Sequence, residues 1–220
     1  MSTNGTSQKA VIKRIGELGA VLIVRCETED EAVNGIRAVT EGGIRAVEVT
    51  FTVPGAPSVI RRVKQAFGDA VLLGAGTVLT AEEAEDAVDA GATYLIAPNT
   101  DEKVIGAAKR LGVPIIPGAF TPTEIVRAWD MGADAIKVFP ASVGGPAYIR
   151  ALKAPLPNIP MIPTGGVDER TVGEFFRAGA FAVGAGGALF DRKRLQAKDY
   201  AGMTEIAKRF SQALKAARES

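Results

Sequence analysis

The sequence contains no histidine, and this absence limits the acid–base chemistry open to the chain. Proton transfer has to use lysine, aspartate, glutamate, tyrosine, cysteine or water. The single cysteine, Cys26, has no partner for an internal disulfide, which is typical of a reducing compartment. No apolar run approaches the roughly 20 residues of a membrane-spanning helix, and no signal peptide is evident. These absences favour a cytoplasmic protein.

An excess of charge of either sign is missing as well. The 26 Lys and Arg residues and 25 Asp and Glu residues leave a formal net charge of +1, without a long charged run. This balance argues against nucleic acid or a membrane as the main partner. The length of 220 residues suits one large α/β domain, and no change of composition marks a second one. We predict a single domain over residues 1–220 in which the polar residues 1–7 lack regular structure.

Short apolar runs rich in β-branched residues recur along the chain, spaced by about 20 to 25 residues, and an amphipathic stretch follows each run. They predict strands at 21–24, 46–50, 71–75, 94–97, 113–116, 135–138, 161–163 and 181–184.

The boundaries of the intervening helices are marked by residue type. Capping-box pairs, in which threonine precedes glutamate by three residues, are Thr28 with Glu31, Thr80 with Glu83 and Thr121 with Glu124. A glycine suited to ending a helix precedes most of the strands. Strand, helix and glycine repeated about eight times predict a (β/α)₈ TIM barrel, with the helix at 8–18 covering its bottom. An open doubly wound sheet is the alternative.

Lys137 lies in an apolar strand-like run at 134–140. Burial lowers the pKa of a lysine and yields a neutral amine that attacks carbonyl groups. Glu48 lies in a similar run at 47–51. Each residue has a simpler interpretation: a lysine that reaches solvent at the end of a strand, or a buried ion pair that holds the barrel. Two ionisable groups that point into one barrel lumen favour a catalytic site over both of these simpler interpretations.

Two Gly-Gly pairs follow the last two predicted strands, where barrels commonly bind phosphate through backbone N–H groups and a helix N-terminus. They are Gly165-Gly166 and Gly186-Gly187. Arg25 ends the first predicted strand and is a candidate for holding a carboxylate, although a surface arginine explains it equally well.

Four segments together resemble the 2-keto-3-deoxy-6-phosphogluconate (KDPG) aldolase family, which includes 4-hydroxy-2-oxoglutarate (KHG) aldolases. They are Val-Glu-Val-Thr-Phe-Thr-Val-Pro around Glu48, Gly-Ala-Gly-Thr-Val at 74–78, Ile-Lys-Val-Phe-Pro around Lys137 and Pro-Thr-Gly-Gly-Val at 163–167. The resemblance runs from about residue 8 to residue 215. It implies a class I aldolase of carbohydrate metabolism on a (β/α)₈ barrel, a homotrimer without metal or cofactor, acting on a phosphorylated 2-keto acid.

The resemblance also implies roles for single residues. Lys137 is the Schiff-base lysine and Glu48 the general acid/base. Thr77 and an arginine surround the pyruvate carboxylate, and the phosphate end is bound by Thr164, Gly165, Gly166, Gly186 and Gly187. Pro98 and Phe139 are predicted to line the reacting carbons.

The chain departs from the family pattern in two places. Many members carry an arginine where Thr52 stands; others carry one at the end of the first strand, and Arg25 fits that second pattern. Many have a serine where Gly187 stands. Thr164 favours KDPG, because the branch that acts on the galactonate epimer (KDPGal) usually lacks that threonine, whereas Pro98-Asn99 and the segment 145–149 resemble that branch.

The sequence therefore predicts cleavage of KDPG to pyruvate and glyceraldehyde 3-phosphate. KDPGal and KHG remain alternative substrates. A different phosphate-binding barrel enzyme, such as an isomerase or a thiamine phosphate synthase-like protein, would share the glycine loops without needing Lys137 opposite Glu48. A non-catalytic, self-assembling barrel scaffold is the last alternative.

Overall fold

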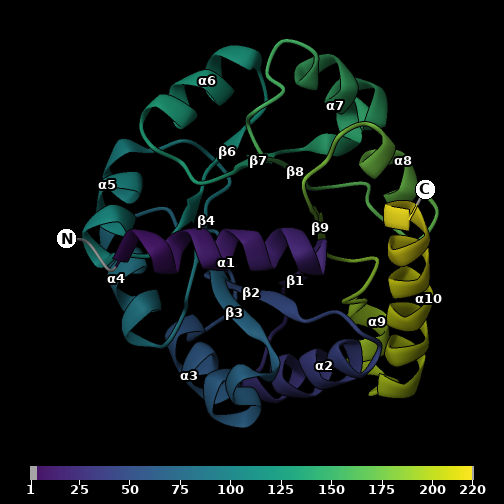
Figure 1. Ribbon diagram of the computed structural model, residues 1–220. Coiled ribbons are helices and arrows are strands. Elements are labelled where there is room, and N and C mark those ends of the chain that lie inside the picture. Colours follow the sequence, from purple (N-terminus) through teal and green to yellow (C-terminus); the bar gives the residue numbers. More distant parts are fainter. Residues whose placement is uncertain (1–3, 220) are drawn as a thin grey trace.

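Helices and parallel strands alternate in the computed structural model, which describes residues 4–219 (Figure 1). The strands are β1 (Ala20–Val24), β2 (Ala46–Thr50), β3 (Leu72–Gly76), β4 (Leu95–Ile96), β5 (Ile115–Ile116), β6 (Gly118–Ala119), β7 (Ile136–Val138), β8 (Met161–Pro163) and β9 (Val183–Ala185). The helices are α1 (Asn4–Leu18), α2 (Glu29–Glu41), α3 (Ala56–Phe67), α4 (Ala81–Asp89), α5 (Glu102–Leu111), α6 (Pro122–Asp130), α7 (Gly145–Lys153), α8 (Val172–Arg177), α9 (Arg192–Gln196) and α10 (Tyr200–Glu219), with 3₁₀ turns η1 (Gly68–Ala70) and η2 (Ala141–Val143).

The strand pairings follow one another around a ring. One sheet has the order β5-β4-β3-β2-β1-β9 and the other β6-β7-β8, with every pairing parallel. Only Pro117 separates β5 from β6, and its carbonyl accepts a hydrogen bond from Lys137 N at 2.9 Å. A parallel bridge between Thr164 and Gly184 joins the other ends of the two sheets. The fold is the predicted (β/α)₈ type. The strand predicted at 113–116 is observed as β5, and β6 continues it beyond Pro117, which has no N–H for the ladder.

Alternation along the strands produces two apolar cores. Val47 and Val49 point outward and pack beneath the helices, whereas Ala46 points into the ring, where it meets Ile15 of α1. Ile15 is fully buried, and α1 lies across one end of the ring (Figure 1). The predicted capping helix is therefore confirmed.

The helix ends follow the predicted residue types. Thr28, Thr80 and Thr121 each accept a hydrogen bond from the backbone N–H three residues ahead. Only at Thr121 does the glutamate return a bond to the capping residue, which completes the capping box. Helix-ending glycines with positive φ are Gly19, Gly43, Gly91, Gly112, Gly132 and Gly179.

Helix α1 begins at Asn4, inside the stretch 1–7 that was predicted to lack regular structure; residues 1–3 lie outside the described part. Extending an existing helix adds one hydrogen bond per residue, so the polar residues continue it. No helix among residues 4–219 is long and apolar enough to cross a membrane.

Candidate active site

Glu48 of β2 and Lys137 of β7 meet inside the ring. Lys137 Nζ lies 4.0 Å from Glu48 Oε1, and the two side chains are only 4% and 1% exposed. Both residues occupy inward positions of their strands, because strand side chains alternate and the neighbours Val47 and Val138 face the helices. The sequence pattern thus places two ionisable groups in one apolar lumen.

Two glycines of β3 allow close packing around Glu48. A Cβ atom at Gly76 would come within 2.7 Å of Glu48 Cδ and Oε1. A Cβ at Gly74 would come within 2.4 Å of the Tyr94 ring, whose hydroxyl donates to Val47 O at 2.7 Å. Gly76 is therefore needed for close packing against the Glu48 carboxylate, and Gly74 for close packing against Tyr94.

Burial is the main influence on Glu48. It raises the pKa of this carboxyl above the usual 4.5, and the nearby cations of Lys137 and then Arg25 partly offset the increase. Oε1 of Glu48 is buried and has no hydrogen-bond partner within the described residues. A buried carboxylate oxygen short of a donor can accept one from a substrate hydroxyl or from water. Glu48 therefore has an unused acceptor oxygen inside the lumen.

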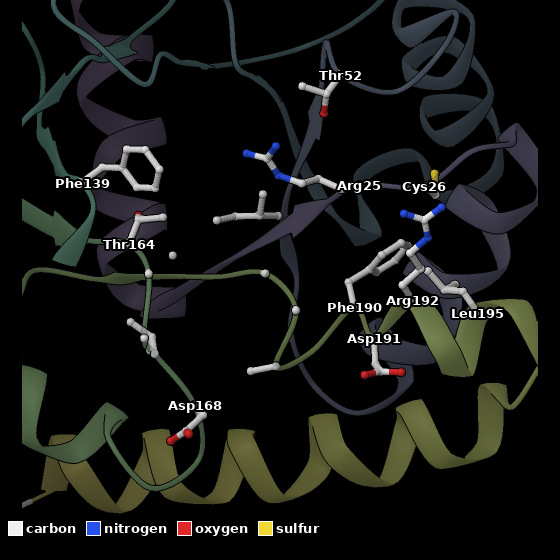
Figure 2. Close-up of a pocket in the computed structure, with 18 of the residues that line it drawn as sticks. Arg25, Cys26, Thr52, Phe139, Thr164, Asp168, Phe190, Asp191, Arg192 and Leu195 are labelled. Atoms are coloured by element: carbon white, nitrogen blue, oxygen red, sulfur yellow. The ribbon is translucent and has the colours of Figure 1, made fainter. Parts of the chain in front are cut away.

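A cavity of about 770 Å³ opens above the pair at the C-terminal ends of the strands (Figure 2). This volume lies within the roughly 300–1,000 Å³ typical of small-molecule sites. Phe139 and Thr164 lie on one side of it and Phe190 on the other, with Arg25 extending between them. The predicted site residues that line it are Arg25, Lys137, Phe139, Thr164, Gly165, Gly166, Gly186 and Gly187. Glu48 lines a small recess of about 10 Å³ that shares Lys137 and Thr164 with this cavity.

Thr77 and Pro98 line neither of these two cavities. Thr77 follows Gly76 at the end of β3 with a positive φ of 54°. The Pro98 carbonyl packs against Gly118, where an added Cβ would lie 2.1 Å from the oxygen. The structure thus gives Pro98 a packing contact, and the substrate contacts predicted for both residues remain predictions.

The glycine loops expose backbone donors to the cavity. Gly165 and Gly166 adopt positive φ values of 101° and 72°, and the N–H groups of Gly165, Gly166, Gly187 and Ala188 have no acceptor within residues 4–219. The helices α8 and α9 begin only at Val172 and Arg192, so neither starts directly after its glycine pair. The sequence-based prediction of a helix N-terminus at this point is therefore wrong. The free amides belong instead to tight turns, which lie between each glycine pair and the following helix.

Sequence reasoning missed the outer wall of the cavity. Glu27, Phe190 and Arg192 line it, and Arg192 pairs with Glu27 across the β1 and β9 ends. The one available signal was that Arg192 follows Gly187 by five residues. Cys26 also lines the cavity, and burial followed by the charge of Glu31 raises the pKa of its thiol to about 11. A protonated thiol is a poor nucleophile, which favours a packing role for Cys26.

Comparison with known proteins agrees with this geometry. A model of the KDPG and KHG aldolase family matches residues 11–206. The 2-dehydro-3-deoxy-6-phosphogalactonate aldolase of Escherichia coli K12 is 37% identical over 175 residues, which cover 79% of this chain and 85% of the relative. The 2-dehydro-3-deoxy-phosphogluconate aldolase of Treponema pallidum is 34% identical over 198 residues, covering 90% and 94%.

A solved structure is similar in fold. It is a KDPG aldolase from Legionella pneumophila with pyruvate captured at low pH as a covalent carbinolamine intermediate. The TM-score is 0.83 at 27% identity, and the alignment covers 91% of this chain and 96% of that one. The family match spans most of the sequence and includes both Glu48 and Lys137. The chain therefore belongs to the KDPG and KHG aldolase family and is a class I aldolase, a carbon–carbon lyase.

Proposed function

We propose that this aldolase cleaves KDPG to pyruvate and glyceraldehyde 3-phosphate, with Lys137 as the Schiff-base lysine and Glu48 as the general acid/base. The observation that carries the proposal is the contact of these two buried ionisable groups beneath a cavity with free backbone amides at its far wall. A buried ion pair is a weak stabiliser, because desolvation offsets the attraction, so a purely structural barrel has little use for it.

The proposed reaction starts at the amine. Neutral Lys137 attacks the C2 ketone, and loss of water gives a protonated Schiff base that withdraws electrons from the C3–C4 bond. Glu48, directly or through a water molecule, takes the proton of the C4 hydroxyl as this bond breaks, and glyceraldehyde 3-phosphate leaves. The enamine is reprotonated at C3, and hydrolysis of the Schiff base releases pyruvate and regenerates the lysine. Phe139, whose ring centre lies 5.2 Å from Lys137 Nζ, limits the access of water.

The epimer preference rests on Thr164, which is buried at the end of β8 beside the glycine pair Gly165-Gly166. Curated relatives at 34% and 37% identity bear the two different substrate names, so overall similarity does not decide between them. The test is a pyruvate-release assay with KDPG, KDPGal and KHG as parallel substrates. The largest kcat/KM is expected for KDPG; a larger value for either other substrate contradicts this preference and leaves the aldolase chemistry intact.

A negative charge at Gly187 tests the phosphate end. A Cβ at Gly187 meets nothing within 4 Å and its φ is not positive, so Gly187→Asp is accommodated without strain. Hydrogen bonds to a charged group contribute about 1.5–3 kcal/mol each, so losing two or three should lower kcat/KM for KDPG by roughly 10² or more. The unphosphorylated sugar acid, 2-keto-3-deoxygluconate, should be a correspondingly poor substrate of the unmodified enzyme.

Gly187→Ser is the matched control, because many family members resemble this variant. It should retain KDPG cleavage, and both variants should still trap pyruvate on Lys137 with borohydride. Equal kcat/KM for the phosphorylated and unphosphorylated sugars would mean that the glycine loops are structural turns only.

We also propose that the protein is a homotrimer assembled through apolar side chains at the barrel rim and helices. The large hydrophobic residues exposed among the described ones are Leu79, Val126, Phe139 and Val143. Light scattering at micromolar concentration should give three times the chain mass of 22.9 kDa. A mass equal to that of one chain would refute the assembly without affecting the chemistry.

A further inference from the structure

We propose that Arg192 binds the distal phosphate of the substrate and that Glu27 competes with the phosphate for its guanidinium. This inference rests on the proposed function, because it requires a phosphorylated substrate. Arg192 begins α9 and Glu27 lies between β1 and α2, and both line the cavity that contains Lys137 and the glycine pairs. Their ion pair, between Arg192 Nη2 and Glu27 Oε1, is exposed to solvent.

Three cationic side chains line the cavity, and they lie at two different places in it. They are Arg25, Lys137 and Arg192. Lys137 forms the Schiff base, and Arg25 is near enough to Glu48 for its charge to lower the pKa of that carboxyl, which places it at the reacting end. Arg192 follows Gly187 by five residues and lies on the opposite wall, beside Phe190 and Leu195 (Figure 2). Of the three, Arg192 is therefore the cation suited to the phosphate end.

The acidic side chains that line the cavity accept hydrogen bonds from backbone N–H groups, with the exception of Glu27. Asp168 accepts from the backbone N–H groups of Arg170 and Thr171, at 2.8 and 2.9 Å. Asp191 caps α9 by accepting from Arg194 N at 2.8 Å.

Glu31 completes this set by accepting from Glu27 N at 2.9 Å. Among the described residues, the Glu27 carboxylate is bonded to Arg192 alone. A phosphate dianion approaching Arg192 therefore displaces one exposed carboxylate and disturbs no other contact.

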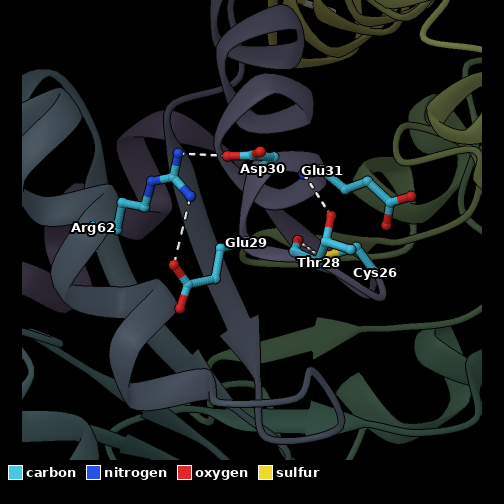
Figure 3. A network of polar contacts seen from close by, with 6 residues as sticks. All are labelled: Cys26, Thr28, Glu29, Asp30, Glu31 and Arg62. Atoms are coloured by element: carbon cyan, nitrogen blue, oxygen red, sulfur yellow. Dashed lines mark hydrogen bonds and ion pairs between the residues drawn. The ribbon is translucent and has the colours of Figure 1, made fainter.

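The residues on either side of Glu27 make polar contacts of their own (Figure 3). Thr28 caps α2, and the Cys26 thiol donates to Thr28 O at 3.4 Å. Arg62 of α3 pairs with Glu29 and Asp30 at 3.5 and 2.5 Å. None of these contacts involves the Glu27 side chain, so this exposed side chain and the long Arg192 side chain are free to exchange partners.

The exchange favours phosphate for electrostatic and geometric reasons. Exposed ion pairs contribute little, because water and salt screen them. A guanidinium binds phosphate through two parallel hydrogen bonds, and the dianion carries more charge than a carboxylate. The free amides of Gly187 and Ala188 add donors on the same loop. Glu27 then keeps the site from holding phosphate too tightly, which aids release of glyceraldehyde 3-phosphate.

The test compares Arg192→Gln and Glu27→Gln with a matched control, Arg62→Gln, which removes the neighbouring ion pairs outside the cavity. Arg192→Gln should lower kcat/KM for KDPG by about 10- to 100-fold, chiefly through KM, with little change for 2-keto-3-deoxygluconate. Glu27→Gln should tighten competitive inhibition by inorganic phosphate by about two- to five-fold, whereas Arg62→Gln should change neither value. Arg192→Lys should fall between the unmodified enzyme and Arg192→Gln, because it keeps the charge and loses the paired donors.

Two further outcomes separate the inference from the proposed function. If the unmodified enzyme prefers KDPG over the unphosphorylated sugar and Arg192→Gln keeps that preference, the role of Arg192 is refuted alone. If the unmodified enzyme has no such preference, the phosphate site and this inference fail together. If inhibition by inorganic phosphate is unchanged or weaker in Glu27→Gln, the proposed competition between Glu27 and phosphate for Arg192 is refuted. Pyruvate trapping on Lys137 in every variant establishes that the fold and the Schiff-base site are intact.

Discussion

Lys137→Ala is expected to abolish the covalent trapping of pyruvate by borohydride and to remove aldolase activity. Borohydride reduces a Schiff base to a stable amine, so the unmodified protein should gain the mass of a reduced pyruvate adduct on Lys137. Without the amine, no iminium forms to accept electrons from the C3–C4 bond. Intact-protein mass spectrometry followed by peptide mapping measures the adduct and its position.

Lys153 provides the matched control for this experiment. Burial lowers the pKa of Lys153, so its amine has increased nucleophilic character. However, Lys153 lies on α7 outside the cavity, and its Nζ donates to Pro157 O and Ile159 O at 2.6 and 3.0 Å. Lys153→Ala should therefore keep full trapping, and an adduct on Lys153 would contradict the assignment of Lys137.

The stability of the Lys137 variant has to be measured alongside. Removing one partner of a buried ion pair leaves the other charge unpaired, which costs about 3–5 kcal/mol when that charge cannot be neutralised. Glu48 can take up a proton, because burial already raises its pKa. Lys137→Met, which retains most of the side-chain volume, is the second variant. A folded Lys137→Met protein that still traps pyruvate would refute the role of Lys137 whatever the fate of Lys137→Ala.

Local sequence patterns predicted most of the barrel, because each is a short-range effect. Threonine–glutamate spacing marks helix starts, glycine supplies positive φ after a helix, and β-branched runs form buried strands. The predicted strands at 46–50 and 161–163 match β2 and β8 residue for residue. The predicted strand at 113–116 ended before Pro117, and the short strand β6 after it was not anticipated. Proline cannot donate to a ladder and is typical of a strand end, so the sequence contains no sign that pairing resumes at Gly118.

The core of the site was predictable for a different reason. An ionisable residue inside an apolar strand conflicts with its surroundings, and Glu48 and Lys137 both show that conflict in the sequence alone. The outer wall shows no such conflict. Glu27 and Arg192 are ordinary exposed charged residues 165 positions apart, and only the ring of strands brings them together. Long-range pairing between surface residues has no periodic signal, so a single sequence does not reveal it.

Glu48→Gln is expected to keep the fold and the pyruvate adduct on Lys137 while lowering kcat by about 10²–10⁴, because positioned proton transfer typically contributes that factor. The amide has nearly the volume of the carboxylate and fits the space that Gly76 leaves. It cannot take the proton of the C4 hydroxyl. Steady-state rates with KDPG, compared with borohydride trapping of pyruvate on the same variant, separate loss of proton transfer from loss of Schiff-base formation.

The pH profile gives this prediction its most specific readout. Burial raises the pKa of Glu48 above 4.5, and the base form of the residue is the carboxylate. Activity should therefore fall as the pH decreases through that raised pKa, so the acid limb of kcat/KM should lie above pH 4.5, and Glu48→Gln should lack it. Arg25→Gln should move the limb to higher pH, because the charge of Arg25 lowers the pKa of Glu48. Glu124→Gln, at an exposed capping residue of α6, should leave the limb unchanged. An identical acid limb in Glu48→Gln would assign the proton transfer to another group, and near-normal turnover of that variant would assign it to bulk water.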